Sequence, residues 1–404
     1  MLFKPNDIPF EYVTPLVYVS DDNRKKEVSS FTEYHFIEEF LIKADLLGHS
    51  DPTMLKELQE LTKFEFDRIK MNNKEIYEAL LNPEKLNIPK EKLNYYCFPS
   101  CTTGISEMNT DFTMNIIKEL KPKNFFDMIC FSGLTHGTSV FHGNRQRELL
   151  LSGEKTLKEV IPYRDIIFQQ LTKKYGFEPE TAFKVSESVR KGKGIQKWQT
   201  ELEEKCPSWY IDIMKKIKYL FPKMHAFSYV LNSLRTFYYK IYHPQAFYTA
   251  ALNRYGITNT SNNTFDYLGF YEKTNTPEDL YRYHAYVRHS TDNAAKEKAN
   301  IHIGNIVYEM KLRGFEIKPP EFSSKALECT PSKKNKKVIL MPLASIAGVG
   351  SETAKLVELG YKTYGDSLYN MTREELFELK VEKDGKEVKA FGKKFLDGYF
   401  GKVD

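Results

Sequence analysis

The sequence predicts an α+β protein that is mostly helical, and three observations support this fold class. From about residue 56 to residue 255 apolar residues recur at helical spacing, interrupted at intervals by proline and glycine. Before this region, residues 12–19 alternate apolar and polar side chains, which is typical of a strand. Near the C-terminus a Gly-x-Gly turn at residues 348–350 separates two stretches with helical patterns. We therefore expect a few strands, a long helical region and a helical hairpin, in that order.

The same patterns divide the chain into four expected regions. Residues 1–55 contain the strands and resemble a fragment of a larger sheet domain. Residues 56–255 form one helical region. A polar stretch at residues 258–264 favours a boundary, so that residues 256–330 form a linker and further helices. Residues 331–404 hold the hairpin.

Composition limits the class of protein. The net charge of the 404 residues is only +5, so any DNA surface has to come from local clusters of cations. Five cysteines without framework spacing indicate a reducing compartment, and Cys97, Cys101, His136 and His142 do not have the spacing of a standard zinc finger. The sequence shows no secretory leader and no apolar run long enough to span a bilayer. We therefore expect a cytoplasmic protein without a membrane partner.

The most informative helix is predicted to begin near Pro222. Its buried stripe, which leaves Arg235 and Tyr239 outside, is Phe227, Val230, Leu231, Leu234, Phe237, Tyr238 and Ile241. Pro222 suits a first helical turn, which places Lys223 and His225 at the positive end of the helix dipole, beside backbone N–H groups without helical partners. Such a helix start binds anions, most naturally phosphate. The alternative is an ordinary amphipathic helix with a solvated lysine.

A second cationic feature precedes this helix. Residues 180–190 predict a helix with apolar positions at Ala182, Phe183, Val185 and Val189, and it runs into Arg190-Lys191-Gly192-Lys193-Gly194. Glycines let a backbone approach a ligand closely, and cations can cradle a polyphosphate. The glycine and lysine spacing is not that of a Walker motif, and a solvated turn is the alternative.

The C-terminal hairpin indicates DNA binding by a different mechanism. Residues 343–357 have the helix, Gly-x-Gly turn, helix pattern of a helix-hairpin-helix. The glycines at 348 and 350 allow a tight turn, and N–H groups that open the second helix can bind a DNA phosphate without reading sequence. The predicted contacts are Gly348, Val349, Gly350 and Ser351. The alternative is a plain helix corner with a glycine C-cap.

Together these segments resemble the PolC-type bacterial DNA polymerase III alpha subunit, a family C replicative polymerase. The similar segments, in order, are 42–53 (IKADLLGHSDPT), 121–126 (KPKNFF), 131–138 (FSGLTHGT), 143–144 (GN), 188–194 (SVRKGKG), 209–212 (WYID), 215–219 (KKIKY), 221–226 (FPKMHA), 313–315 (RGF) and 343–350 (LASIAGVG). The resemblance covers most of the chain. It implies that residues 1–55 are the end of a palm, 56–255 the fingers, and 331–404 a duplex-binding region.

The resemblance also implies where catalysis takes place. Nucleotidyl transfer uses two Mg²⁺ ions held by palm carboxylates. Asp45, in Lys-Ala-Asp-Leu-Leu-Gly, corresponds to one of these catalytic, metal-binding residues, and Glu33 is the nearby alternative. The family's paired palm carboxylates have no counterpart in this sequence, so we expect a second polymerase polypeptide to complete the metal site.

For the incoming dNTP the resemblance implies contacts from Lys223, His225, Arg190, Lys191 and Lys193. Weaker candidates for the pocket lining are Ser132, His136 and Asn144, with Phe221 and Tyr229 as an apolar wall for the base. His136 is equally well explained as a structural histidine.

The function implied is that of a DNA-directed DNA polymerase that binds primer-template and dNTP during replication, in a bacterial cell or a phage-infected host. A sliding clamp would be reached through the second polypeptide. Two alternatives remain open: a catalytically silent, polymerase-derived DNA-binding scaffold, and a nucleotide-binding regulator that uses only the fingers pocket.

Overall fold

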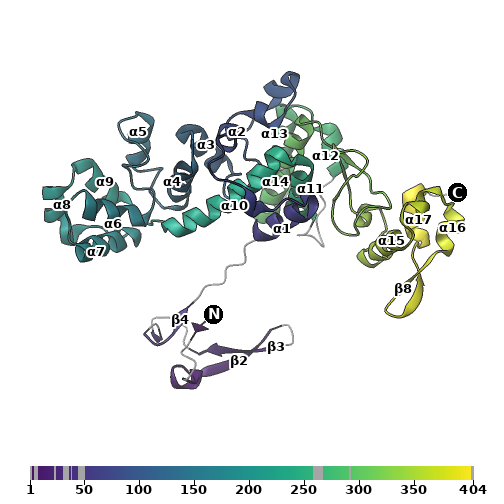
Figure 1. Cartoon of the computed structure of the whole chain (residues 1–404), viewed down its shortest axis with the longest axis horizontal. Coiled ribbons are helices and arrows are strands. Elements are labelled where there is room, and N and C mark those ends of the chain that lie inside the picture. The colour runs from purple at the N-terminus through teal and green to yellow at the C-terminus, as the bar shows by residue number, and fades with distance from the viewer. Residues whose placement is uncertain are drawn as a thin grey trace. The chain divides into compact units, whose positions relative to one another are not determined.

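The computed structural model describes residues 2–3, 8–21, 24–30, 36–37, 39–43, 51–257, 267–290 and 293–401 (Figure 1). The chain forms two compact units, Met1–Ser50 and Asp51–Asp404. Helices predominate and the strands form small sheets, which confirms the predicted mostly helical α+β class. None of the described helices combines the length and apolar character needed to cross a membrane. Asp45, Glu33 and the polar stretch 258–264 lie outside the described residues.

The first unit contains two antiparallel strand pairs and a short 3-10 helix. Strand β1 (Leu2–Phe3) pairs with β4 (Ile42–Lys43), and β2 (Leu16–Asp21) pairs with β3 (Arg24–Ser29). The 3-10 helix η1 (Phe10–Tyr12) precedes β2. Apolar side chains on both strands of the β2–β3 pair are exposed, namely Val17, Tyr18, Val19 and Val28.

The second unit begins with a long series of helices. They are α1 (Asp51–Thr62), α2 (Lys74–Ala79), α3 (Asp111–Leu120), α4 (Phe125–His136), α5 (Gln146–Leu151), α6 (Arg164–Lys173), α7 (Pro179–Arg190), α8 (Gln199–Lys205), α9 (Ser208–Lys216), α10 (Lys223–Tyr242), α11 (Pro244–Leu252), α12 (Tyr267–Lys273), α13 (Pro277–Ser290) and α14 (Ala294–Leu312). One apolar core runs through most of them.

Helix α10 is the axis of this helical region and contacts α1, α2, α4 and α11 (Figure 1). It begins one residue later than predicted, because Pro222 is its N-cap. Val230, Leu234, Phe237 and Ile241 are buried as the stripe predicts, whereas Phe227, Leu231 and Tyr238 are only half-buried. The prediction that Tyr239 lies outside the buried face is wrong. Tyr239 is buried because neighbouring elements enclose α10 on more than one side. Its hydroxyl donates to the Phe64 carbonyl at 2.6 Å.

The core also holds a buried ion pair. The Lys240 ammonium lies 2.7 Å from a Glu309 carboxylate oxygen, and both side chains are fully buried. Lys240 also donates to the Cys101 and Thr103 carbonyls, each at 2.7 Å. The Tyr248 hydroxyl donates to Glu309 at 2.8 Å. Burial dominates the effect on Lys240 and lowers its pKa, although Glu309 opposes this shift.

The C-terminal part contains a mixed sheet and a second core. Strand β7 (Val338–Leu340) lies between β5 (Glu316–Lys318), parallel to it, and β6 (Thr330–Pro331), antiparallel to it. Next come η8 (Leu343–Ser345), α15 (Ser351–Tyr364), η9 (Gly365–Asn370), α16 (Arg373–Glu378), β8 (Lys380–Lys383), β9 (Lys386–Lys389) and α17 (Lys393–Phe400). Their core includes Leu343, Val357, Phe391 and Phe395.

The structure corrects the predicted hairpin in one respect. Its first element is the short 3-10 helix η8, not an α-helix. The N–H groups of Leu343 and Ala344 donate to the Lys325 and Ala326 carbonyls, both at 3.0 Å. The backbone at Ile346 is extended, so the helical pattern ends there. The first element of the hairpin is therefore one short 3-10 helix that ends before the Gly348 turn.

Candidate nucleotide and DNA sites

The segment before α10 lies between two other predicted site segments. The Thr138 N–H donates to the Tyr219 carbonyl, and the Lys218 N–H donates to the Thr138 carbonyl, both at 3.0 Å. The Leu220 N–H donates to the Arg190 carbonyl at 3.3 Å. Backbone bonds therefore join the end of α4, the cationic loop after α7 and the start of α10, which are far apart in the sequence.

The loop after α7 depends on its glycines. Gly192 has a φ of +67°, and a Cβ atom there would lie 2.4 Å from the Lys218 carbonyl oxygen, so only glycine allows this close approach. The Ser188 hydroxyl donates to the Gly194 carbonyl at 2.7 Å, which closes the loop. Lys191 and Lys193 are exposed on it. The loop therefore presents two lysines to solvent on a defined backbone.

Arg190 is held by a carboxylate that sequence reasoning did not assign. Its Nη2 and Nε atoms donate to Glu187 at 2.9 and 3.1 Å, and Arg164 of α6 reaches the same carboxylate at 3.3 Å. The hydrogen bonds from Arg190 are the main reason that the pKa of Glu187 is lowered. The i, i+3 spacing of Glu187 and Arg190 on α7 is a local signal that could have revealed this pair.

A carboxylate also occupies part of the α10 N-terminus. The Lys223 N–H donates to Asp165 Oδ2 at 2.9 Å, so the prediction of an unpartnered N–H is wrong at this residue. The Lys223 ammonium lies 5.7 Å from the Tyr163 ring centroid, and His225 is exposed. The helix start thus attracts an anionic oxygen, as the dipole argument predicts, and in this structure the oxygen belongs to the protein.

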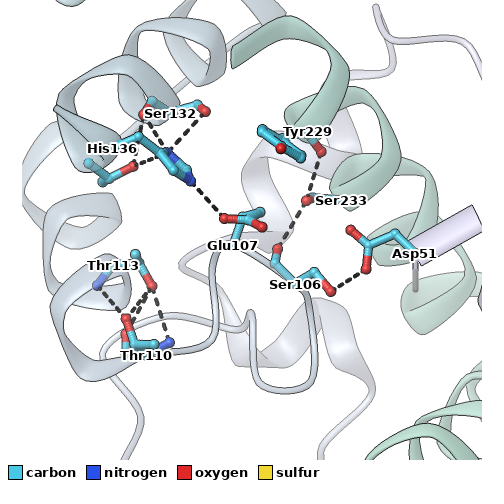
Figure 2. Close-up of polar contacts among 10 residues, drawn as sticks. Asp51, Ser106, Glu107, Thr110, Thr113, Ser132, His136, Tyr229 and Ser233 are labelled. Carbon is cyan, nitrogen blue, oxygen red and sulfur yellow. Dashed lines mark hydrogen bonds and ion pairs between the residues drawn. The ribbon is translucent and has the colours of Figure 1, made fainter. Parts of the chain in front are cut away.

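His136 forms the centre of a polar and aromatic cluster at the end of α4 (Figure 2). Its Nε2 lies 2.7 Å from Glu107 Oε2, and its Nδ1 lies 2.7 Å from the Ser132 carbonyl oxygen. Its ring is nearly parallel to those of Phe221 and Tyr229, at centroid distances of 4.7 and 5.9 Å. We call these three rings the aromatic wall. Burial lowers the pKa of His136, but the hydrogen bonds to Glu107 and to the Ser132 carbonyl outweigh it and raise the pKa overall.

Two predicted pocket residues lie inside the protein. Ser132 is 1% exposed, and its backbone carbonyl is the oxygen that receives His136. Asn144 is 3% exposed, and its amide nitrogen donates to the carbonyls of Ser139 at 2.9 Å and Ile213 at 3.2 Å. Both residues therefore hold the surrounding segments in place, whereas the cations and the aromatic wall lie nearer the surface.

At the hairpin the two glycines have different conformations. Gly348 has a φ of +78°, whereas Gly350, the N-cap of α15, has a φ of −81° that any residue can adopt. A Cβ atom would meet open space at either position. Only Gly348 therefore needs to be glycine for the turn. Val349 is 7% exposed and packs in the C-terminal core, so its side chain does not face outward.

The start of α15 is exposed at Gly350 and Ser351, and α15 has no side-chain cap. Glu352 in the first turn pairs with Lys355 at 2.8 Å and with Lys383 at 2.9 Å. These two lysines lower the pKa of Glu352 to about 2, the hydrogen bond from Lys355 first. The surface around the helix start thus combines backbone donors with lysines, as a DNA phosphate requires.

Within the described part of the chain, no group of three or more His, Cys, Asp or Glu side chains is close enough to hold a metal ion. The predicted metal ligand Asp45 and its alternative Glu33 are not among these residues. Sequence reasoning also missed Glu107 and Asp165. Their partners lie 29 and 58 residues away, so no local pattern could reveal them.

Comparison with known proteins identifies the class of these segments. Residues 51–208 match the profile of the bacterial DNA polymerase III alpha subunit finger domain. The chain is also 35% identical, over 352 residues, to the protein named DNA polymerase III PolC-type from Staphylococcus aureus strains MRSA252, MW2 and USA300. These matches confirm the predicted resemblance to a PolC-type alpha subunit. They cover 85% of this chain but 23% of each relative, so the chain spans about a quarter of their length.

Proposed function

We propose that this chain is the fingers-bearing part of a replicative DNA-directed DNA polymerase. It binds the incoming dNTP and the duplex primer-template, and a further polypeptide supplies the paired palm carboxylates. One observation carries the proposal. Backbone hydrogen bonds join three segments that are predicted to contact the nucleotide, namely the end of α4, the loop after α7 and the start of α10. The first two segments lie in the region that matches the finger profile, and α10 follows that region.

The nucleotide contacts in this proposal are Lys223, His225, Arg190, Lys191 and Lys193, with the aromatic wall beside them. Metal ions neutralise only part of the triphosphate charge, so cations are needed to stabilise the charge that develops on the leaving pyrophosphate. Lys191 and Lys193 are exposed on a loop of fixed shape, and the start of α10 already interacts with an anionic oxygen. Ser132 and Asn144 support this site from inside the protein.

The palm contribution of this chain is Asp45, which would hold Mg²⁺ together with carboxylates from the other polypeptide. Carboxylate and other oxygen ligands suit Mg²⁺, which usually keeps some water ligands and binds substrate phosphates. The metals would lower the barrier by activating the primer 3′ hydroxyl and clamping the triphosphate. Lys223 and its neighbours would orient the triphosphate from the fingers side.

The exposed apolar side chains of the first unit support the need for a second polypeptide. Val17 and Val19 are 47% exposed, Tyr18 is 67% exposed and Val28 is 39% exposed, on a sheet that has two strands among the described residues. Exposed strand edges and apolar side chains favour pairing with further strands. An obligate interface of this kind typically buries beyond about 2,000 Å². Clamp contacts would be made by the same polypeptide.

Primer extension with magnesium tests the proposal. We expect no extension by this chain alone, and extension with co-elution when it is mixed with a polypeptide that carries the paired palm carboxylates. Robust extension by the isolated chain would refute the need for a second polypeptide. Nucleotide binding without extension in any mixture would instead support a nucleotide-binding regulator, and DNA binding alone would support a scaffold.

A further inference from the structure

The protonation state of His136 follows from its two hydrogen bonds. Nε2 faces the Glu107 carboxylate and Nδ1 faces the Ser132 carbonyl, each at 2.7 Å. Both partners are acceptors, so both ring nitrogens have to carry a proton for both bonds to form. These two contacts are shorter than those from Nδ1 to the Thr135 and Ser132 hydroxyls, at 3.2 and 3.4 Å, and they favour the imidazolium form of His136. Its position in the last turn of α4 adds the favourable negative end of the helix dipole.

A charged His136 strengthens the aromatic wall. The ring planes of His136 and Phe221 differ by 16°, those of His136 and Tyr229 by 12°, and those of Phe221 and Tyr229 by 16°. A cation held against an aromatic face is attracted by the electrons of the ring, more strongly at desolvated sites than at exposed ones. Loss of the charge would therefore loosen both aromatic rings beside Lys223 and His225.

The loop that carries Glu107 is built to present this carboxylate. Glu107 has a φ of +66°, a strained conformation that non-glycine residues rarely adopt. The preceding Ser106 is fixed on two sides: its hydroxyl donates to Asp51 of α1, and its carbonyl accepts from the Ser233 hydroxyl of α10 at 3.0 Å (Figure 2). Contacts with two helices thus maintain a strained backbone whose side chain reaches His136.

We propose that Glu107 is a positioning residue for the nucleotide site, acting through the His136 imidazolium to hold Phe221 and Tyr229 in the parallel arrangement that receives the incoming nucleotide. This inference rests on the proposed function, because it requires that a nucleotide binds beside the aromatic wall. It predicts that dNTP affinity depends on the protonation of His136.

The polar and titratable groups around His136 come from several elements of the structure. Glu107 comes from the loop before α3, and Ser132 and Thr135 contact the ring from α4 itself. On α10, the His225 ring centroid lies 5.7 Å from the Phe221 ring centroid, and Tyr229, which carries a hydroxyl, contributes its ring to the aromatic wall. Lys223 lies over Tyr163, and Tyr219 pairs with Thr138 just after α4. The wild type and Glu107→Gln differ only at residue 107, so their comparison isolates the contribution of Glu107.

The test measures two quantities in the full chain: the titration of His136 by NMR and the dissociation constant of dNTP from about pH 6 to pH 9. In Glu107→Gln, His136 should titrate at lower pH than in the wild type. The dNTP affinity should be close to wild type at the acidic end, and its loss of about tenfold, roughly one charge-assisted contact, should occur at lower pH in the variant than in the wild type. In a complete polymerase complex, KM should rise more than kcat falls.

The matched control is Glu119→Gln. Glu119 is 26% exposed, close to the 27% of Glu107, and pairs with Arg147 instead of a histidine. This variant should retain the wild-type pH profile. His136→Gln offers an independent route if Glu107→Gln fails to fold, since it should make dNTP affinity uniformly weak across this pH range.

Three results would overturn the inference. An unchanged His136 titration in Glu107→Gln would show that the carboxylate does not maintain the imidazolium. A shifted titration with unchanged dNTP affinity would show that the pair is structural only. Absence of dNTP binding by the wild-type chain at every pH would refute the proposed function itself, and the inference would fail with it.

Discussion

Lys223 and Asp165 should affect nucleotide binding in opposite directions. A charge-assisted contact from Lys223 to phosphate is worth about 1.5–3 kcal/mol. In this structure its ammonium lies 5.7 Å from the Tyr163 ring centroid. Giving up that interaction costs about 0.5–1 kcal/mol. The net contribution is about 0.5–2.5 kcal/mol, so Lys223→Ala should weaken dNTP binding and incorporation about 2- to 70-fold.

Asp165→Asn should strengthen dNTP binding. The asparagine oxygen can still accept the Lys223 N–H, which is 2.9 Å away in the wild type, so the helix start should keep its structure. Only the negative charge beside the phosphates is removed. Two unit charges about 4 Å apart in water interact by about 1 kcal/mol, which sets the gain at no more than about fivefold.

Single-nucleotide incorporation by the assembled polymerase, combined with calorimetric dNTP binding to this chain, measures both effects. Lys184→Ala is the matched control, because Lys184 lies on α7, is 58% exposed and pairs with Glu180 at 2.6 Å. It should change neither quantity. If Lys223→Ala left dNTP binding unchanged and weakened only primer-template binding, the lysine would face DNA and the proposed nucleotide site would be misplaced.

Three further predictions concern the hairpin, the metal site and the core. Gly348→Val should strain a backbone with a φ of +78° and weaken binding to all DNA sequences alike. The slope of log affinity against log salt concentration should flatten by about 0.9 for each DNA phosphate that the variant no longer binds. Gly350→Val should keep the wild-type affinity and salt slope, because its φ of −81° suits any residue. Equal losses in both variants would contradict this distinction. Asp45→Asn should reduce primer extension by orders of magnitude while DNA binding measured by fluorescence anisotropy survives, and retained extension would exclude Asp45 from the metal site. Lys240→Met should leave the Glu309 carboxylate buried without its cation and lower the free energy of unfolding in urea by about 3–5 kcal/mol, with much of it restored by adding Glu309→Gln. A loss below about 1 kcal/mol would show that the pair is dispensable.

The helices were predictable because their apolar spacing is a local property. Helix α7 matches the predicted range to within one residue, and Val230, Leu234 and Phe237 are buried on α10 as expected. Burial of Tyr239 and Lys240 was not predictable, since it depends on how α10 is enclosed. The partner of Lys240, Glu309, lies 69 residues away on α14, and no single-helix pattern carries that information.

The charged residues of the candidate site were likewise predictable only where the sequence signal is local. Its cations stand out in the sequence because Arg190, Lys191 and Lys193 are clustered and Lys223 follows a proline. Asp165, which accepts the Lys223 backbone N–H, and Glu107, which contacts His136, come from distant elements, whereas Glu187 lies three residues before Arg190 on α7. At the hairpin, the extended backbone at Ile346 ends the first element as a 3-10 helix, and the local glycine pattern does not encode that conformation.

Carboxylates lie beside several of the residues predicted to bind the nucleotide. Arg190 contacts Glu187 and His136 contacts Glu107, while Asp165 accepts the backbone N–H of Lys223 at the start of α10. Unopposed cations gathered in one site would repel one another, so the carboxylates stabilise the site before the nucleotide arrives.

In the proposed nucleotide site, a metal-bound triphosphate would have to displace or outweigh those carboxylates, so its net affinity would be the difference between two sets of charge-assisted contacts. A difference of this kind limits how tightly any phosphate is held. Because pyrophosphate must leave and the next nucleotide must enter after every addition, moderate affinity suits repeated turnover better than the tight binding that the cations alone would give.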